Sequence, residues 1–143
     1  MANDVRITDV VANAMMEALS TAAGEAGKLR IYIASYPAGE PGTTPTTLLA
    51  ELTMNADAFG AAAAATSYST LTAGAVTSDA DANASGDAAY FSLWDSAGTT
   101  PIMSGTVGTA STDMIIDNIT IAAGATVSCS ALTISLPKGW TTA

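Results

Sequence analysis

The sequence predicts a mainly β fold: an antiparallel β-sandwich or small barrel of about seven short strands, with one short N-terminal helix. Short apolar segments recur at roughly even spacing between residues 28 and 137, and polar, Gly- or Pro-containing turns separate them. Aromatic and large aliphatic residues, which favour strands, are concentrated in segments 89–94 and 102–107. Helical spacing of apolar residues is clear only near the N-terminus.

Length and charge limit the possible classes of protein. A chain of 143 residues is expected to form one domain, which we divide into an N-terminal segment and helix (1–27), a β-domain (28–137) and a tail (138–143). Only 12% of the residues are charged, so Thr, Ser, Ala and Gly must form much of the surface. The net charge of −9 argues against nucleic acid or an anionic membrane as a direct partner.

The N-terminal helix is expected to begin after a cap at Thr8 or Asp9 and to end at Gly24 or Gly27. Its apolar residues form one stripe at helical spacing: Val10, Val11, Ala14, Met15, Ala18, Leu19 and Ala22. Two interpretations remain open, because the stripe can pack on its own domain or contact another subunit.

Residues 28–35 form the clearest half-buried strand, because three aliphatic residues alternate with Lys28, Arg30 and Tyr32. Lys28 and Arg30 share the polar face, which is either solvated or directed at an acidic patch on a neighbour. A loop rich in Pro and Gly follows at residues 36–47, and loops of this length are usually functional or mobile. A second strand is expected at 48–54.

The middle of the chain is harder to assign. Residues 58–78 contain no charge, and we expect a turn followed by a strand at 69–77 rather than a helix in the Ala-rich part. Asp79, Asp81 and Asn83 resemble the opening of a calcium loop, but Ala84 and Tyr90 stand where that loop needs Gly and Glu. The segment 79–87 is therefore read as a solvated acidic turn, with a weak calcium site as the alternative.

The segments 89–94 and 102–107 predict a central hairpin, since the Asp, Ser, Gly and Pro residues between them favour a turn. Its large side chains, Tyr90, Phe91, Leu93 and Trp94, are expected to lie at the centre of the core.

Two further strands are predicted at 114–121 and 126–136, the second with a bulge near Ala131. Cys129 in that strand is expected to be a small buried side chain.

The residues do not favour catalysis. The chain has no His, so the commonest general base is missing and Cys129 has no His to activate it. Lys28 and Lys138 have no acidic partner nearby in the sequence. We expect no enzyme activity, cofactor or metal, and neither a secretion signal nor a membrane span is recognisable.

Several segments together resemble small virion proteins of tailed bacteriophages: GKLRIY (27–32), TLLAEL (47–52), AYF (89–91), DSAGTT (95–100) and MSGTVG (103–108). Proteins of this kind are similar to decoration, or cement, proteins, which bind the outside of the capsid shell where capsomers meet, often as trimers. The resemblance implies a structural protein of the virion surface, made in the cytoplasm of the bacterial host, whose partners are the major capsid protein and its own copies. The alternative is a tail or fibre module that binds a host surface or a glycan.

Candidate partner contacts lie in the N-terminal segment, the first strand, the Pro-rich loop and the tail. These residues are Asp4, Arg6, Lys28, Arg30, Pro41, Pro45 and Trp140.

Overall fold

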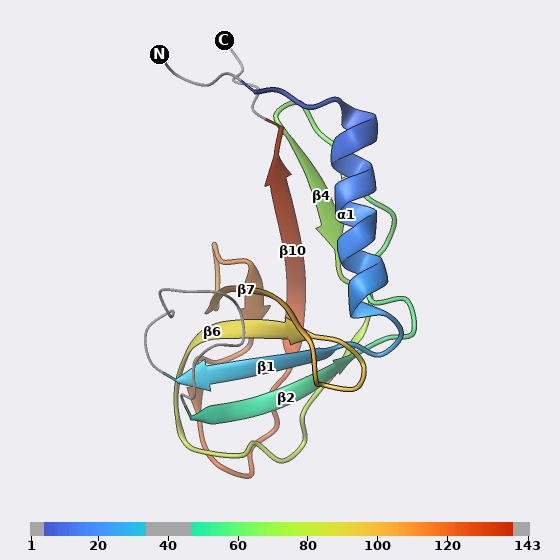
Figure 1. Cartoon of the computed structure of the whole chain (residues 1–143). Coiled ribbons are helices and arrows are strands. Elements are labelled where there is room, and N and C mark those ends of the chain that lie inside the picture. The colour runs from blue at the N-terminus through green and yellow to red at the C-terminus, as the bar shows by residue number, and fades with distance from the viewer. Residues whose placement is uncertain (1–4, 34–46, 139–143) are drawn as a thin grey trace.

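The computed structural model describes residues 5–33 and 47–138, which form one helix and ten strands (Figure 1). In chain order these are α1 (Asp9–Ala23), β1 (Lys28–Ile33), β2 (Leu48–Met54), β3 (Ala63–Ala64), β4 (Tyr68–Thr72), β5 (Val76–Thr77), β6 (Gly86–Trp94), β7 (Pro101–Gly108), β8 (Met114–Ile116), β9 (Thr120–Ile121) and β10 (Cys129–Pro137).

The strands form one curled sheet in the order β3-β4-β10-β8-β7-β6-β1-β2-β5, and β9 pairs with β6. The sheet is mixed, because β7 and β8 run parallel while the other pairs are antiparallel. The sheet curls into a half-barrel, and an isolated bridge between Asp79 and Val127 joins the segment after β5 to the segment before β10. The mainly β prediction with one helix is confirmed, whereas a sandwich and a count of seven strands are not.

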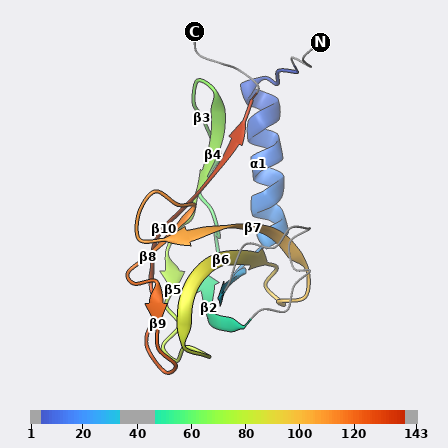
Figure 2. The same cartoon turned by 90° about the vertical axis from the view of Figure 1, so that its left-hand side faces the viewer.

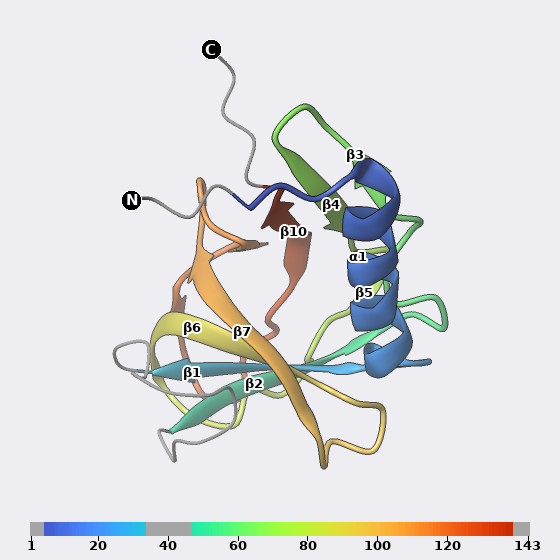
Figure 3. The same ribbon diagram turned by 45° about the horizontal axis from the view of Figure 1, so that its top comes forward.

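The molecule has two regions. In Figure 1, β1, β2 and β6 cross beneath an upright arm made of α1, β4 and most of β10. Figure 2 shows α1 running alongside β3, β4 and β10, so the helix covers one face of this part of the sheet. Seen from above in Figure 3, β7 crosses over β6 and β1. The arm therefore stands out from the curled body, and its helix is covered on one side only.

The limits of α1 follow from its caps, as predicted. The Thr8 side chain accepts a hydrogen bond from the Val11 N–H at 3.3 Å, which satisfies a free donor of the first turn. Gly24 ends the helix at φ 64°, a backbone conformation that Gly adopts without strain.

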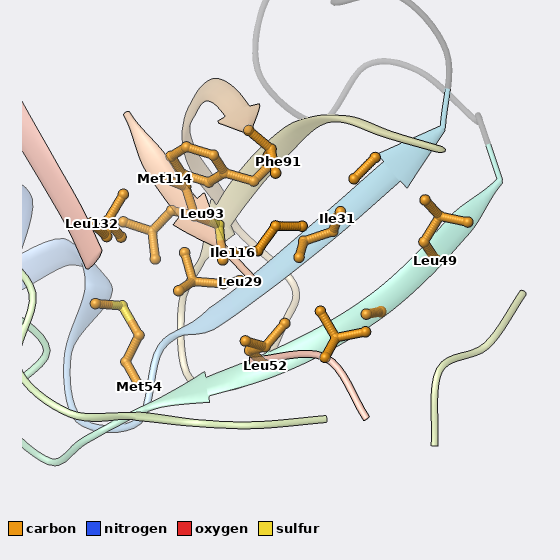
Figure 4. Packing of buried hydrophobic residues seen from close by; sticks show 14 of the residues in the cluster. Leu29, Ile31, Leu49, Leu52, Met54, Phe91, Leu93, Met114, Ile116 and Leu132 are labelled. Carbon is orange, nitrogen blue, oxygen red and sulfur yellow. The ribbon is translucent and has the colours of Figure 1, made fainter. Parts of the chain in front are cut away.

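The core lies on the inner face of β1, β2 and β6 (Figure 4). Leu29, Ile31, Phe91 and Leu93 are fully buried, because the period of two places alternate residues of each strand on one face. Gly105 pairs with Phe91 across β6 and β7, and a Cβ atom on Gly105 would lie 2.6 Å from the Phe91 ring. The ring thus occupies the space that a larger residue at position 105 would fill.

Two aromatic residues of the predicted core belong to the opposite face. Tyr90 is buried, but it stacks on Tyr32 outside the hydrophobic cluster. Trp94 is only half-buried, at the end of β6. The hairpin is confirmed, and Tyr90, Phe91 and Leu93 are buried as predicted; the prediction is wrong for Trp94, because β6 alternates between faces and its last residue is half-buried.

Two predicted strands are each divided. Segment 69–77 contains β4, which pairs with β10, and β5, which pairs with β2, so the chain leaves one part of the sheet and enters another. Segment 114–121 contains β8 and β9, separated at Asn118, whose side chain accepts a hydrogen bond from the Thr120 N–H at 3.0 Å. Such local Asx turns compete with continued strand pairing.

The last strand confirms the predicted bulge. The register of β10 against β8 shifts between Cys129 and Ala131. Cys129 is half-buried rather than buried, because this irregular part of the strand lies beside the surface.

Candidate interaction surfaces

The residues predicted to contact a partner do not gather at one site. Asp4, Pro41, Pro45 and Trp140 lie outside the described residues. Arg6 precedes α1, whereas Lys28 and Arg30 begin β1 beyond the other end of the helix. A 15-residue helix is about 22 Å long, so Arg6 is remote from the other two cations.

Arg30 lies in a cluster on the outer face of the sheet. Its Nε donates a hydrogen bond to Glu51 Oε2 at 2.7 Å, and its guanidinium carbon lies 4.6 Å from the centre of the Trp94 ring. The turn between β6 and β7 closes over it, since a Cβ on Gly98 would lie 2.7 Å from an Arg30 nitrogen. Arg30 is thus held by groups of its own chain, and its side chain is only 23% exposed.

Aromatic side chains continue this cluster along β1 and β6. The Tyr32 and Tyr90 rings stack with their centroids 5.1 Å apart. Burial raises the pKa of the Tyr32 phenol, although the Arg30 charge opposes part of the rise. The Trp94 Nε1 is buried without a hydrogen-bond partner of normal geometry. Arg, Tyr and Trp are common at binding hot spots, but here they pack against one another, so the cluster is a closed platform rather than an open site.

Lys28 extends the platform, and its Nζ donates to Thr53 Oγ1 at 2.9 Å. Partner contacts by Lys28 and Arg30 stay a prediction, now restricted to the exposed parts of both side chains.

The docking of α1 depends on polar contacts. Asp9, Asn13 and Glu17 are spaced four residues apart, so they lie along one line of the helix. Asp9 Oδ1 accepts from Lys138 Nζ at 2.5 Å, Asn13 Oδ1 from Ser69 Oγ at 2.5 Å, and Glu17 Oε1 from the Ala62 N–H at 2.6 Å. These three contacts attach the helix to β4, to the segment before β3 and to the residue after β10.

The buried apolar side of α1 is small. Ala12, Met16 and Ala23 are buried, and Leu19 packs partly against the core. Four apolar residues, two of them Ala, contribute little buried area, so the polar contacts matter for holding the helix in place.

The opposite side of α1, which we call its outer face, is apolar and exposed. Val10, Val11 and Met15 are 79%, 47% and 51% exposed. The complete set is Val10, Val11, Ala14, Met15, Ala18 and Ala22. The two charged residues of α1, Asp9 and Glu17, each contact a group on the sheet side, but both are exposed, and the Asp9 side chain is 57% exposed. Most of the predicted apolar stripe therefore does not pack on its own domain; only Leu19 does so.

Lys138 makes a structural contact that sequence reasoning missed. Its side chain is 1% exposed and contacts both Asp9 and the Ala65 carbonyl. Its backbone carbonyl accepts from the Ile7 N–H at 3.0 Å, so the two ends of the described chain meet at the start of α1. Asp9 and Lys138 are 129 positions apart, and no local pattern in the sequence relates them.

Two acidic residues, Asp79 and Asp113, accept hydrogen bonds from groups of their own chain. Asp79 accepts from the N–H groups of Glu51 and Asp81, and Asp113 accepts from the N–H and hydroxyl of Thr106. Within residues 5–33 and 47–138, no three His, Cys, Asp or Glu side chains are grouped closely enough to hold a metal ion.

Two remaining features offer little for chemistry. Burial raises the pKa of the Cys129 thiol to about 11, so it stays protonated at neutral pH. A cavity of about 110 Å³ beside Asp117, Thr120 and Ser128 is much smaller than the roughly 300–1,000 Å³ of typical ligand pockets.

Comparisons with known proteins find no matching family, no similar curated protein and no similar solved structure. In the described part of the chain, no helix has both the length and the apolar character needed to cross a membrane.

Proposed function

We propose that this chain is a structural virion protein that binds the outer surface of a bacteriophage capsid and stabilises it, as a decoration or cement protein does. The outer face of α1 is the observation that carries the proposal. Exposed apolar side chains are suited to protein contacts, because burying them against another protein removes them from water. The resemblance of the sequence to virion proteins is the reason for placing that contact on a virus particle.

The copy number in purified particles tests this proposal. A decoration protein should be present on heads at hundreds of copies, and its removal should lower the temperature at which heads lose their shape or release DNA. Absence from heads, or heads of unchanged stability after its removal, would contradict the proposal.

A tail or fibre module that binds a glycan is the second candidate. Tyr68 is 44% exposed at the start of β4, and Thr70 and Thr72 lie on the same face of that strand. An exposed ring beside hydroxyl groups can stack on a sugar and hydrogen bond to it. A few copies on tails, together with glycan binding that Tyr68→Ala abolishes, would favour this candidate over a capsid role.

A further inference from the structure

We propose that the cavity beside β9 binds the end of an alkylammonium chain, in the form of a lysine side chain presented by a partner protein. The cavity measures about 110 Å³ and lies between segment 117–121 and segment 125–128, just before β10. In Figure 2, β9 lies at the end of the molecule opposite the start of α1, so this site is separate from the outer face of that helix. The proposal goes beyond the capsid role and does not depend on it.

The polar groups at the rim favour a ligand that donates hydrogen bonds. Asp117 is exposed there, and its carboxylate has no hydrogen-bond or ion-pair partner among residues 5–33 and 47–138. The Thr120 hydroxyl also lines the cavity, and it donates to Asp87 Oδ1 at 2.8 Å. A carboxylate only accepts hydrogen bonds, and a hydroxyl whose proton is already used still has lone pairs to accept one. A cationic donor therefore fits this rim, whereas an anion does not.

The basic residues of the chain bind elsewhere. Lys28 and Arg30 bond to residues of β2, and Lys138 bonds to the first turn of α1. Arg6 precedes α1, at the end of the molecule opposite β9. The net charge of −9 attracts cations from outside. The cation that pairs with Asp117 must therefore come from another molecule.

The floor and the size of the cavity favour an unbranched chain. Ile121 and Val127, each 5% exposed, form part of an apolar floor. A lysine side chain can lay its methylene groups along such a surface while its ammonium stays at a polar rim. One water takes about 30 Å³ in the liquid, so the cavity holds only a few non-hydrogen atoms. Arg carries a larger, planar group that pairs best with bidentate acceptors, so the compact ammonium of Lys fits better.

Backbone pairing holds both walls of the cavity in place. On one side, Thr120 and Ile121 pair with residues at the start of β6. On the other side, the Val127 N–H donates to the Asp79 carbonyl at 2.8 Å, and the Asp79 N–H donates to the Val127 carbonyl at 3.0 Å. A site that is already ordered loses less free energy when a ligand enters.

Ile119 indicates that the ammonium belongs to a protein rather than to a free amine. Its side chain is 38% exposed and lies in the chain between Asn118 and Thr120, which both line the cavity. A free alkylamine that fills the cavity would leave Ile119 in water. A partner chain that carries the lysine can cover Ile119 as well, which adds apolar burial to the ionic contact.

An NMR titration of the full chain with Nα-acetyl-lysine amide, at fixed ionic strength, tests the proposal. We expect saturable shifts of the backbone amides within residues 117–128 and a millimolar dissociation constant, because one side chain makes few contacts. Nα-acetyl-norleucine amide has the same stem without the ammonium, so it should bind about threefold to fivefold more weakly, the upper range for a partly exposed ion pair. n-Butylammonium, which lacks the amide groups, should also bind more weakly than the lysine probe.

Two variants separate the cavity from general attraction to an acidic protein. Asp117→Asn should raise the dissociation constant of the lysine probe by about threefold to fivefold. Asp57→Asn is the matched control, because it removes the same charge from an exposed residue that does not line the cavity, and it should leave the constant unchanged. Asp117 is exposed, so its replacement should not disturb the fold, and equal melting temperatures of the two variants would verify this.

Several results would overturn the proposal. Shifts that do not saturate, or equal weakening by both variants, would indicate general attraction only. Equal binding of the norleucine and lysine probes would remove the ammonium, tighter binding of Nα-acetyl-arginine amide or of Ca²⁺ would change the class of ligand, and n-butylammonium binding as tightly as the lysine probe would remove the partner protein. The capsid role is tested separately on heads: lysine binding by a protein absent from heads would remove that role alone, and decorated heads without lysine binding would remove this proposal alone.

Discussion

At the scale of single residues, successive side chains of β6 point to opposite faces of the sheet, so its aromatic residues make two kinds of contact. Phe91 faces inward and is fully buried in the hydrophobic cluster. Trp94 faces outward, is half-buried and contacts Arg30 through the face of its ring. Both residues are large and aromatic, but only Phe91 closes the core.

Replacing these two residues should have different effects on stability. Phe91→Ala should lower the free energy of unfolding by about 3–5 kcal/mol, because it removes a buried ring and leaves a cavity. Trp94→Ala should cost clearly less, since part of the ring is already in water and the contact with Arg30 is worth about 0.5–1 kcal/mol at such sites. Urea unfolding of both variants measures the difference. An equal loss would show that the outer cluster contributes as much as the core.

At the scale of elements, polar contacts hold α1 against the arm of the sheet. The buried Lys138 ammonium is compensated by Asp9 on the first turn of the helix. Burying a charge is tolerated when it is paired and hydrogen bonded, so this ion pair should matter more than an exposed one.

Removing the charge of Asp9 should therefore loosen the helix. Asp9→Asn should lower stability by about 1–3 kcal/mol, the range for leaving a buried group poorly satisfied. Glu17→Gln is the control, because Gln can still accept from the Ala62 N–H and no cation lies in that contact. Adding Lys138→Met to Asp9→Asn should recover part of the loss, since it removes the uncompensated charge. Thermal melts of the four proteins test this, and equal losses for Asp9→Asn and Glu17→Gln would contradict it.

The turn between β6 and β7 should make the free energy of unfolding depend on pH. The backbone N–H groups of Thr99 and Thr100 donate to the Asp95 carboxylate at 2.8 and 3.2 Å, which lowers the pKa of Asp95. A carboxyl group with a lowered folded pKa stabilises the fold above its unfolded pKa of about 4, and this stabilisation is lost as the pH falls through the folded value.

Melting temperatures measured between about pH 6 and pH 2 should therefore fall more steeply for the wild type than for Asp95→Asn at the acidic end. The Asn side chain still offers an oxygen acceptor to both N–H groups but does not titrate there. Parallel curves for the two proteins would show that the turn does not contribute to the acid sensitivity.

At the scale of the whole molecule, the chain combines a net charge of −9 with an uncharged outer face on its only described helix. Long-range repulsion limits association generally, whereas close contact is possible where charge is absent. The two ends of the described chain also meet beside the start of this helix, through the Ile7 and Lys138 backbones. Contacts made by α1 and by residues next to it would thus lie at one end of the molecule.

Attachment to capsids should respond weakly to salt if apolar groups dominate it. Raising the salt from low concentration to about 0.5 M screens exposed charges but not buried apolar contacts. We expect the amount of protein on purified heads to change little over this range, as measured by sedimentation of the heads. Release by salt alone would instead implicate Lys28 and Arg30 with acidic groups of the coat.

The sequence by itself determined the local elements. Caps at Thr8 and Gly24, alternation in β1, the bounds of β2 and the hairpin turn all follow from neighbouring residues. Turn chemistry and hydrophobic period act over a few positions, so a sequence shows them directly.

Only the tertiary structure decided how these elements meet. The parallel pairing of β7 with β8 and the separation of β4 from β5 depend on partners distant in the chain. The orientation of α1 is the clearest case: its apolar stripe left open whether it packs on its own domain or contacts another subunit, and in the structure Lys138, Ser69 and the Ala62 N–H bind the polar line of the helix. Helical spacing shows that the helix has an apolar face. Which side of the helix is buried depends on the groups that the folded sheet places beside it.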